Sequence, residues 1–171
     1  MSIRCIKDEN HVDELLKNLD MLQNMKIQVG IMSEAGEDML TIARVHEFGC
    51  TIEVTDKMRR YLHGIGIHLK KDTKVINIPE RSFIRAGFDD SSDKIESGTS
   101  AMIRHLLRGE TDMDGFINFI GPYVTGLIEQ YFRDLSTPPL HPVTIKRKKS
   151  SNPLEDTGHL RNTITYKIVR S

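Results

Sequence analysis

The sequence has no tryptophan, and its 171 residues include only four tyrosines, six phenylalanines and two cysteines. A hydrophobic core therefore has to be built mainly from Ile, Leu, Val and Met. The two cysteines, Cys5 and Cys50, do not have the spacing of metal ligands, which predicts free thiols in a reducing compartment and no bound cofactor. The mean hydropathy of −0.37 is mildly polar, so we expect the chain to depend on partners for full rigidity.

Long apolar runs are also missing. No stretch approaches the roughly 18 apolar residues that a membrane-spanning helix requires. The first residues do not combine a basic flank with an apolar stretch, so no secretory signal is expected. These absences predict a protein that is made in the cytoplasm and has no membrane partner.

Neither sign of charge is in excess, because 24 Lys and Arg residues balance 24 Asp and Glu residues. A net charge of zero argues against a general nucleic-acid-binding protein, since affinity for phosphates comes mainly from positive charge. The charges are nevertheless uneven: the net charge is −6 over residues 1–56, +5 over residues 57–108 and +1 over residues 109–171. The acidic and basic segments can neutralise one another within the fold, which is the more common case, or pair head to tail between copies in a ring.

The spacing of apolar residues predicts helices interleaved with short strands. Helices are expected over residues 11–22, 38–48, 57–63, 82–108 with a polar interruption at 89–93, 113–135 and 157–162. Strands are expected over residues 26–32, 51–54 and 164–168. Pro122 is expected to kink or restart its helix. Because no regular βαβ rhythm is present, we expect the α+β class: a single domain over residues 1–171, with a small, mostly antiparallel sheet packed against several helices.

Two segments are expected to project from this domain. Ile67–Leu69 and Val75–Ile78 flank a Lys-Lys-Asp-Thr-Lys tip and are predicted to pair, so that residues 57–78 form a protruding basic hairpin. Residues 137–153 are rich in proline and predict an extended arm that carries the run Lys146, Arg147, Lys148 and Lys149. A solvated loop is the simpler explanation of this run, although four basic charges also suit non-specific contact with DNA phosphates.

Two groups of residues partly match motifs of metal-binding or nucleotide-binding proteins. His46 and Glu47 with Cys50 supply only half of a zinc site, so structural or interface contacts at a helix end are the favoured role. Gly64 and Gly66 lack the third glycine and the following helix of a dinucleotide-binding loop, and they predict a turn.

A third group contains the residue types of a hydrolase triad. Asp156 and His159 lie near Ser150 and Ser151, but no G-x-S-x-G turn is present to expose a nucleophile. The run Asp156-Thr157-Gly158 instead predicts a helix-capping turn from which Arg161 projects. We therefore expect no catalytic site and no enzymatic activity.

Three further segments, in this order, carry a resemblance to a known family. They are Ile42-Ala43-Arg44-Val45-His46-Glu47-Phe48-Gly49, then Ile78-Pro79-Glu80-Arg81-Ser82-Phe83-Ile84-Arg85, then Leu154-Glu155-Asp156-Thr157-Gly158-His159-Leu160-Arg161-Asn162-Thr163-Ile164-Thr165-Tyr166. The order resembles the virion-morphogenesis and tail-completion family of tailed bacteriophages and prophages, which includes neck and head–tail joining proteins. Residues 139–148 also resemble a proline-rich stretch of that family, with His141 where Ser is commoner. The resemblance covers about residues 40–170.

The resemblance implies a structural virion protein. Its subunits would form a ring of six or twelve identical copies at the head–tail junction or the tail end. The implied partners are other copies of the chain, head-completion or adaptor proteins, and a tail-terminator or tail-tube protein, with DNA passing through the channel. The chain would be made in the host cytoplasm and assembled into the virion.

The motif residues have two possible roles, as part of the core or in contacts between subunits. Phe48, Phe83 and Ile84 are predicted to be core anchors. Arg44, Arg81, Arg85 and Arg161 are expected to pair with carboxylates such as Glu47 or Asp156, within a subunit or across an interface. Gly49 is predicted to end its helix.

The uneven charge leads to a hypothesis for the ring contacts. A set of acidic residues would face a set of basic residues of a neighbour: Glu34, Glu37, Asp38, Glu47, Glu53 and Asp56 opposite Lys57, Arg59, Arg60, Lys70, Lys71 and Lys74. Three other functions stay open: a tail-tube terminator, a DNA-contacting accessory protein that uses the basic segments, and a metal-dependent hydrolase that uses His46, Glu47 and Cys50.

Overall fold

The computed structural model describes residues 12–139, 145, 154 and 158–170 of the chain. Its helices are α1 (Val12–Gln23), the short 3-10 helix η1 (Ser33–Ala35), α2 (Glu37–Phe48), α3 (Asp56–Gly64), α4 (Arg85–Asp90), α5 (Ser92–Leu107), α6 (Met113–Asp134) and α8 (His159–Asn162). Its strands are β1 (Met25–Ile31), β2 (Cys50–Glu53), β3 (Val75–Ile78) and β4 (Ile164–Arg170). The α+β class and the antiparallel pairing are confirmed, and the strands are divided between two separate sheets of two strands each.

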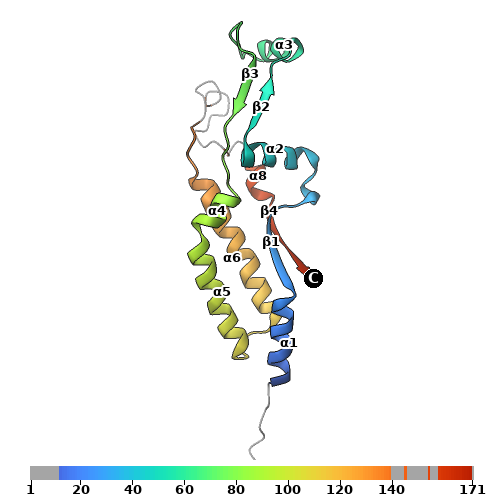
Figure 1. Cartoon of the computed structure of the whole chain (residues 1–171), viewed down its shortest axis with the longest axis vertical. Coiled ribbons are helices and arrows are strands. Elements are labelled where there is room, and N and C mark those ends of the chain that lie inside the picture. The colour runs from blue at the N-terminus through green and yellow to red at the C-terminus, as the bar shows by residue number, and fades with distance from the viewer. Residues whose placement is uncertain (1–11, 140–144, 146–153, 155–157, 171) are drawn as a thin grey trace, which may run out of the picture.

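The first sheet pairs the first strand of the described chain with the last one. Strands β1 and β4 run antiparallel, with Ile27 opposite Ile168, Val29 opposite Tyr166 and Ile31 opposite Ile164. These pairs face α6, while Lys26, Gln28, Thr165 and Lys167 at alternate positions are exposed, as the period of two in a strand predicts. Helix α6 therefore packs against both strands on one side and against α4 and α5 on the other (Figure 1).

The core is built around α6 and contains no tryptophan. Fully buried Phe83 and Phe132 meet edge to face, with ring centroids 5.1 Å apart. The remaining buried side chains are mostly Ile, Leu, Val and Met, as the composition predicts. Burial along α6 follows helical spacing, and this periodicity explains why the longest helix of the sequence is also its best predicted one.

Three helical glycines make room for tyrosine rings. A Cβ atom at Gly98 would lie 2.6 Å from the ring of Tyr123, and one at Gly121 would lie 2.4 Å from the ring of Tyr166. A Cβ at Gly87 would lie 3.2 Å from Tyr131. The small residues thus let α4, α5 and β4 approach α6 closely, because each ring fills the space that a side chain would need.

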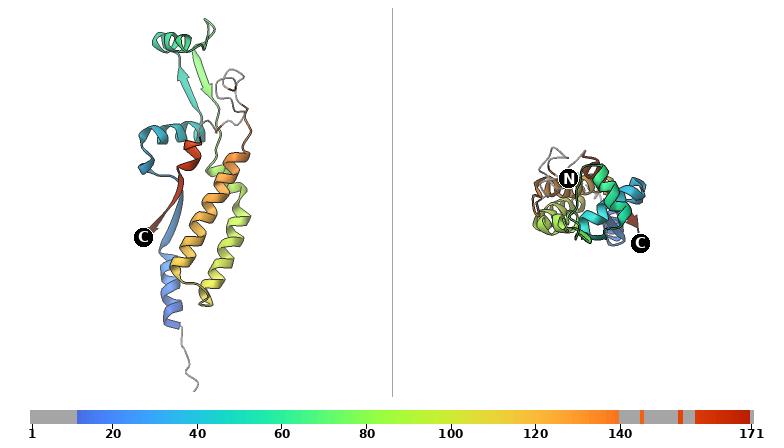
Figure 2. Two further views of the ribbon diagram at one scale, coloured as in Figure 1. Left: turned by 180° about the vertical axis from the view of Figure 1, so that it is seen from behind. Right: turned by 90° about the horizontal axis from the view of Figure 1, so that it is seen from above.

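The second sheet forms an arm that projects from one end of the molecule (Figures 1 and 2). Strands β2 and β3 run antiparallel, with Ile52 opposite Ile76, and α3 lies at the tip between them. Thr55 caps α3 by accepting a hydrogen bond from the Met58 amide at 3.2 Å, as expected of a Thr at this position. We define residues 50–78 as the arm.

The predicted hairpin is therefore wrong in its pairing. Ile67–Leu69 is not a strand, and β3 pairs with β2 instead. Alternating apolar residues indicate that Ile67–Leu69 and Val75–Ile78 are candidate strands, but they do not indicate with which strand either one pairs. The arm accordingly starts at Cys50 rather than at residue 57, with the basic residues at its tip.

Two helix predictions also change. The helix expected from Ser82 begins at Arg85, because residues 82–84 donate hydrogen bonds to Glu47 instead of forming a helical turn. This first helix, α4, ends before Ser91, near the predicted interruption, and α5 follows. Helix α6 continues through Pro122 as one element of 22 residues, so a restart of the helix is wrong. Buried residues on both sides of Pro122, from Ile120 to Val124, hold the helix together where one backbone hydrogen bond is missing.

The proline-rich stretch 137–153 lies largely outside the described residues, and so does the run Lys146–Lys149. Asn10, Asp156 and Thr157 also lie outside them. Among the residues that the structure covers, no helix is long and apolar enough to cross a membrane.

Candidate functional site

The three sequence motifs meet at the base of the arm. The first motif ends α2, the second leads from β3 into α4, and α8 of the third motif contacts α2 (Figure 1). We call this region the junction and define it as Glu47–Gly49, Glu80–Ala86 and α8. Both strands of the arm leave from it, since β2 starts directly after Gly49 and β3 ends shortly before Glu80.

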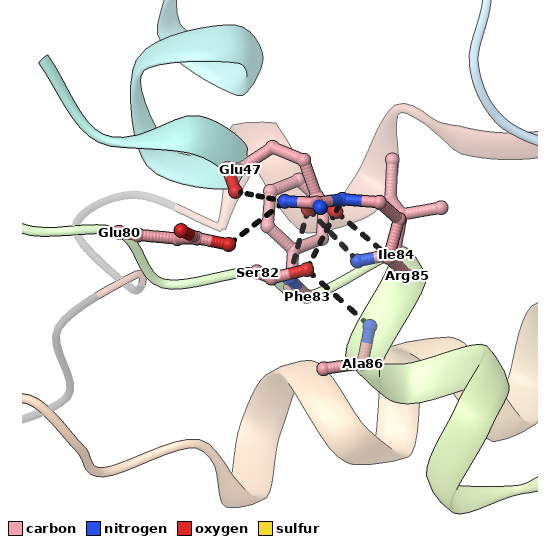
Figure 3. A network of polar contacts seen from close by, with 7 residues as sticks. All are labelled: Glu47, Glu80, Ser82, Phe83, Ile84, Arg85 and Ala86. Atoms are coloured by element: carbon pink, nitrogen blue, oxygen red, sulfur yellow. Dashed lines mark hydrogen bonds and ion pairs between the residues drawn. The ribbon is translucent and has the colours of Figure 1, made fainter.

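Glu47 is the centre of the junction (Figure 3). Its side chain is buried, with the residue only 5% exposed, and its carboxylate accepts hydrogen bonds from three successive backbone amides. These amides belong to Phe83, Ile84 and Arg85, at 2.9, 3.0 and 3.0 Å. The Ser82 hydroxyl donates a fourth hydrogen bond at 2.7 Å. The carboxylate therefore caps the start of α4 from another helix, in the place where a helix terminus favours negative charge.

The hydrogen bonds control the ionisation of Glu47. Burial raises the pKa of its carboxyl, but the bonds from Ile84, Ser82, Arg85 and Phe83 together outweigh burial and leave the pKa below its ordinary value. Glu47 is therefore a carboxylate at neutral pH. A carboxyl with a lowered pKa and saturated acceptors is suited to holding structure rather than to proton transfer.

Arg85 completes the neutralisation of Glu47. Its Nε lies 3.1 Å from the Glu47 carboxylate, while its Nη2 donates to the Glu47 carbonyl at 2.9 Å and to the Glu80 carboxylate at 2.8 Å (Figure 3). The hydrogen bond to Glu47 raises the pKa of the Arg85 guanidinium. The predicted pairing of Arg85 with Glu47 is thus confirmed, and it lies within one subunit.

Phe48 is not a core anchor, because the residue is 61% exposed. The Arg85 guanidinium lies over its ring, 4.6 Å from the centroid, so the aromatic ring supports the arginine at the surface instead of filling the core. Phe83 is fully buried, as predicted, and Ile84 packs against the core in a half-buried position.

Gly49 is required by both conformation and space. Its φ is +71°, and a Cβ atom there would lie 2.9 Å from the Glu80 amide nitrogen and 3.0 Å from the Ile78 carbonyl oxygen. Both neighbours are backbone atoms and cannot swing away. The glycine therefore lets the start of β2 pass directly against the end of β3.

Arg81 has a different partner from the one predicted. It is 5% exposed, and it donates to the carbonyl oxygens of Pro138 and Pro139 at 2.9 and 3.2 Å rather than to a carboxylate. Burial lowers the pKa of its guanidinium. The Arg81 amide also donates to the His46 carbonyl at 2.7 Å. Arg81 thus fixes the chain after α6 to the junction.

The third motif contributes one helical turn. Gly158, with φ +75°, precedes α8, and buried Leu160 anchors this turn in the core. Arg161 is half-buried, whereas Arg44 on α2 is exposed. The predicted capping by Asp156 and Thr157 lies outside the described residues.

Part of the predicted charge contact between subunits is contradicted. Glu47 cannot face a neighbour, because it is buried among groups of its own chain. Arg59 is also engaged internally, donating to the carbonyls of Lys70 and Thr73 at 2.8 and 2.6 Å and holding the tip loop. The other basic residues of that set are exposed at the tip: Lys57, Arg60, Lys70, Lys71 and Lys74.

A metal site at His46, Glu47 and Cys50 finds no support in the geometry. The Glu47 oxygens are occupied by amide, hydroxyl and guanidinium donors, and Cys50 lies in β2 as a half-buried free thiol. Within the described part of the chain, no three His, Cys, Asp or Glu side chains are grouped to hold a metal ion.

Sequence reasoning did not assign roles to Ser82 and Glu80. The Ser82 hydroxyl donates to Glu47 and accepts from the Ala86 amide at 3.3 Å. Ser82 is the first residue of the helix predicted from the sequence, and a Ser at the start of a predicted helix is the signal that could have indicated a role in satisfying the free amides there.

Comparison with known proteins gave no match to a family model, to a curated protein or to a solved structure. The family resemblance therefore depends on the three motifs, and the functional argument depends on the geometry above.

Proposed function

We propose that the chain is a structural, non-catalytic virion protein of a tailed phage or prophage. Copies of it would form a ring, six- or twelve-fold by the family resemblance, that joins the tail to the head-completion proteins. The same ring would surround the DNA channel, where contact with DNA is non-specific.

One observation carries this proposal. The residues that resemble the family motifs are used to fix a projecting arm to a packed body, and the arm itself has no buried residue between positions 50 and 78. A two-stranded sheet without a core is at best marginally stable alone, so an ordered arm of this kind is suited to packing against a neighbouring molecule. A rigid body with such an arm fits an assembly subunit better than an enzyme.

The proposal is tested by deleting the gene from the phage genome that encodes it and complementing the deletion in trans. We expect filled heads and separate tails to accumulate, because each part assembles but the joint is missing. Complementation with the intact chain should restore joined particles. Normal infectious particles without the gene would contradict the proposal.

The same experiment separates the closest alternative. A tail-tube terminator stops growth of the tube, so its loss should give tails of uncontrolled length rather than tails of normal length. A DNA-contacting accessory protein should leave joined particles with defective DNA content. Tail length and DNA content in electron micrographs therefore distinguish the three roles.

A further inference from the structure

We propose that the tip of the arm, through helix α3, docks into an apolar groove on the body of the next copy of the chain. This inference rests on the proposed ring and specifies its contact surfaces. The sequence predicts a purely electrostatic contact between copies. The proposed contact is instead apolar at its centre and has charged residues around it.

The first surface is the apolar face of α3. Met58, Tyr61 and Leu62 of α3, with Ile65 directly after the helix, are spaced i, i+3, i+4 and i+7, which is the spacing of anchors in helices that bind grooves. Tyr61 is 66% exposed and Ile65 is 37% exposed, while Met58 and Leu62 are half-buried. Large apolar side chains at the end of a projecting arm, with no buried residue beneath them, indicate a surface that a partner covers.

The second surface is a groove of about 770 Å³ on the body of the molecule, which extends from the junction along α6. Its floor is one stripe of α6, formed by Phe116, Ile120, Val124 and Ile128. The floor residues are buried, and at 1.5 Å per residue the stripe from Phe116 to Ile128 is about 18 Å long. Helix α3 has nine residues and is therefore about 14 Å long, so its length does not exceed that of the groove.

The accessible apolar surface of the groove lies on its walls, because the floor residues are at most 5% exposed. One wall is β1, through Met25, Ile27 and Val29, and no residue of β4 lines the groove. The other wall comes from α4 and α5 and includes Phe88, which is 50% exposed at the rim. Phe88 is therefore an exposed apolar side chain that the exposed Tyr61 and Ile65 of a neighbouring arm can cover.

Charge complementarity selects the arm as the occupant. Residues 56–74 at the tip carry six basic and two acidic side chains, a net charge of +4. The groove is flanked by α1 and by residues 85–96, each of which has a net charge of −2. Of the exposed acidic residues in this segment, Asp89 lines the groove beside Phe88, whereas Asp90, Asp93 and Glu96 lie further along the chain. Opposite charges around an apolar centre are the arrangement of a specific protein interface.

The two surfaces differ, so the contact is heterologous and can close into a ring. The arm projects from one end of the molecule (Figure 1), whereas the groove lies on the body and is lined by β1, α4, α5 and α6. The junction around Glu47 sets the direction of the arm and therefore the angle between successive copies.

The experiment is cross-linking between two differently tagged full-length chains, both with Cys5→Ser and Cys50→Ser. One chain carries Tyr61→Cys and the other carries Phe88→Cys, and a short bis-maleimide joins them if the tip enters the groove. The matched control replaces Phe88→Cys with Lys167→Cys, an exposed position on the outward face of β4. We expect a cross-linked heterodimer with Phe88→Cys and at least about tenfold less product with Lys167→Cys.

A second variant measures the energetics without a cross-linker. Tyr61→Ser with Ile65→Ser removes two exposed apolar groups, and we expect self-association measured by light scattering to weaken about tenfold or more, as the loss of interface anchors does. Because both positions are exposed, folding should be unchanged by circular dichroism.

Three results would overturn the inference. The first is equal or absent cross-linking at Phe88→Cys and Lys167→Cys. The second is unchanged association of the Tyr61/Ile65 variant, which would leave the ring proposal standing with other contact surfaces. The third is protection of Phe88→Cys from maleimide in the dilute monomer, which would show that the chain covers its own groove. The deletion phenotype tests the ring independently, so the two proposals fail separately.

Discussion

At the scale of single residues, Glu47 connects parts of the chain that are distant in sequence. Its carboxylate accepts five hydrogen bonds from residues 82–85, and its own helix α2 ends one residue later. Three of the donors are backbone amides at the start of α4, which have no partner within that helix. The side chain thus replaces a local N-cap and joins two helices.

Removal of the Glu47 carboxylate should be strongly destabilising. We expect Glu47→Ala to lower the free energy of unfolding by about 3 kcal/mol, because buried amides and Arg85 lose a charged acceptor. The matched control is Glu80→Ala, which removes an exposed ion pair to the same arginine and should cost less than about 1 kcal/mol. Urea unfolding of both variants provides the measurement, and equal small effects would show that Glu47 does not hold the junction.

The lowered pKa of Glu47 also predicts a dependence of stability on pH. A carboxyl whose pKa is lower in the folded than in the unfolded state stabilises the fold above its ordinary value of 4.5, and this stabilisation is lost as the pH falls through the lowered folded pKa. The difference in unfolding free energy between the wild type and Glu47→Gln should therefore be largest at neutral pH and shrink below about pH 4.5. A difference that stays constant from pH 7 to pH 3 would contradict this.

At the scale of elements, glycine residues allow α5 and β4 to pack close to α6, because a larger side chain at Gly98 or Gly121 would collide with a tyrosine ring. The Cβ test at Gly121 gives a contact of 2.4 Å with Tyr166, while Gly126, in the same helix, has nothing within 4 Å. The two positions thus separate the effect of crowding from the effect of helix propensity.

We expect opposite results from alanine at these two positions. Gly121→Ala should destabilise the protein by about 1–3 kcal/mol, because β4 has to move away from α6. Gly126→Ala should stabilise it by about 0.5–1 kcal/mol, since alanine is the better helix former. Thermal unfolding followed by circular dichroism measures both, and stabilisation by Gly121→Ala would contradict the packing of Tyr166 on α6.

Periodicity in the sequence was sufficient to predict most elements but not their partners. The helices at 12–23, 37–48 and 113–134 follow apolar stripes, and β1 and β4 follow alternation, because each pattern reflects burial on one face. The pairing of β3 with β2 depends on contacts across residues 54–74, and no local pattern encodes it.

The junction was predictable only in part for the same reason. Its residues are marked by the motifs, and the pairing of Arg85 with Glu47 was expected from charge. Two features could not be predicted, because they arise only when α2 approaches α4 in the folded chain. Glu47 is buried against the amides of residues 83–85, and the ring of Phe48 lies under the Arg85 guanidinium at the surface.

At the scale of the whole molecule, charge is divided between the arm and the body. The tip carries exposed lysines at positions 57, 70, 71 and 74, and the flanks of the groove are acidic. This separation predicts a head-to-tail contact that weakens as salt is added, because exposed charges are screened within about 10 Å at 0.1 M salt.

Reversal of charge at the tip tests this contact. Lys70→Glu with Lys71→Glu should weaken self-association of the full-length chain and abolish its salt dependence, because the net charge of residues 56–74 falls from +4 to zero, with four basic and four acidic side chains. The control is Lys167→Glu with Arg170→Glu, which makes the same change in net charge on β4, away from the tip and the groove. Sedimentation at low and high salt measures both, and an unchanged oligomer in the tip variant would remove the electrostatic part of the account.

The central claim is that this chain is a ring-forming structural protein at the joint between head and tail. Electron cryo-microscopy of intact particles from the encoding phage tests it most directly. The account predicts a closed ring of this chain at the head–tail junction, with each arm reaching the body of the next subunit. The claim would be contradicted by particles that show complete density at the junction and in the tail but do not contain this chain.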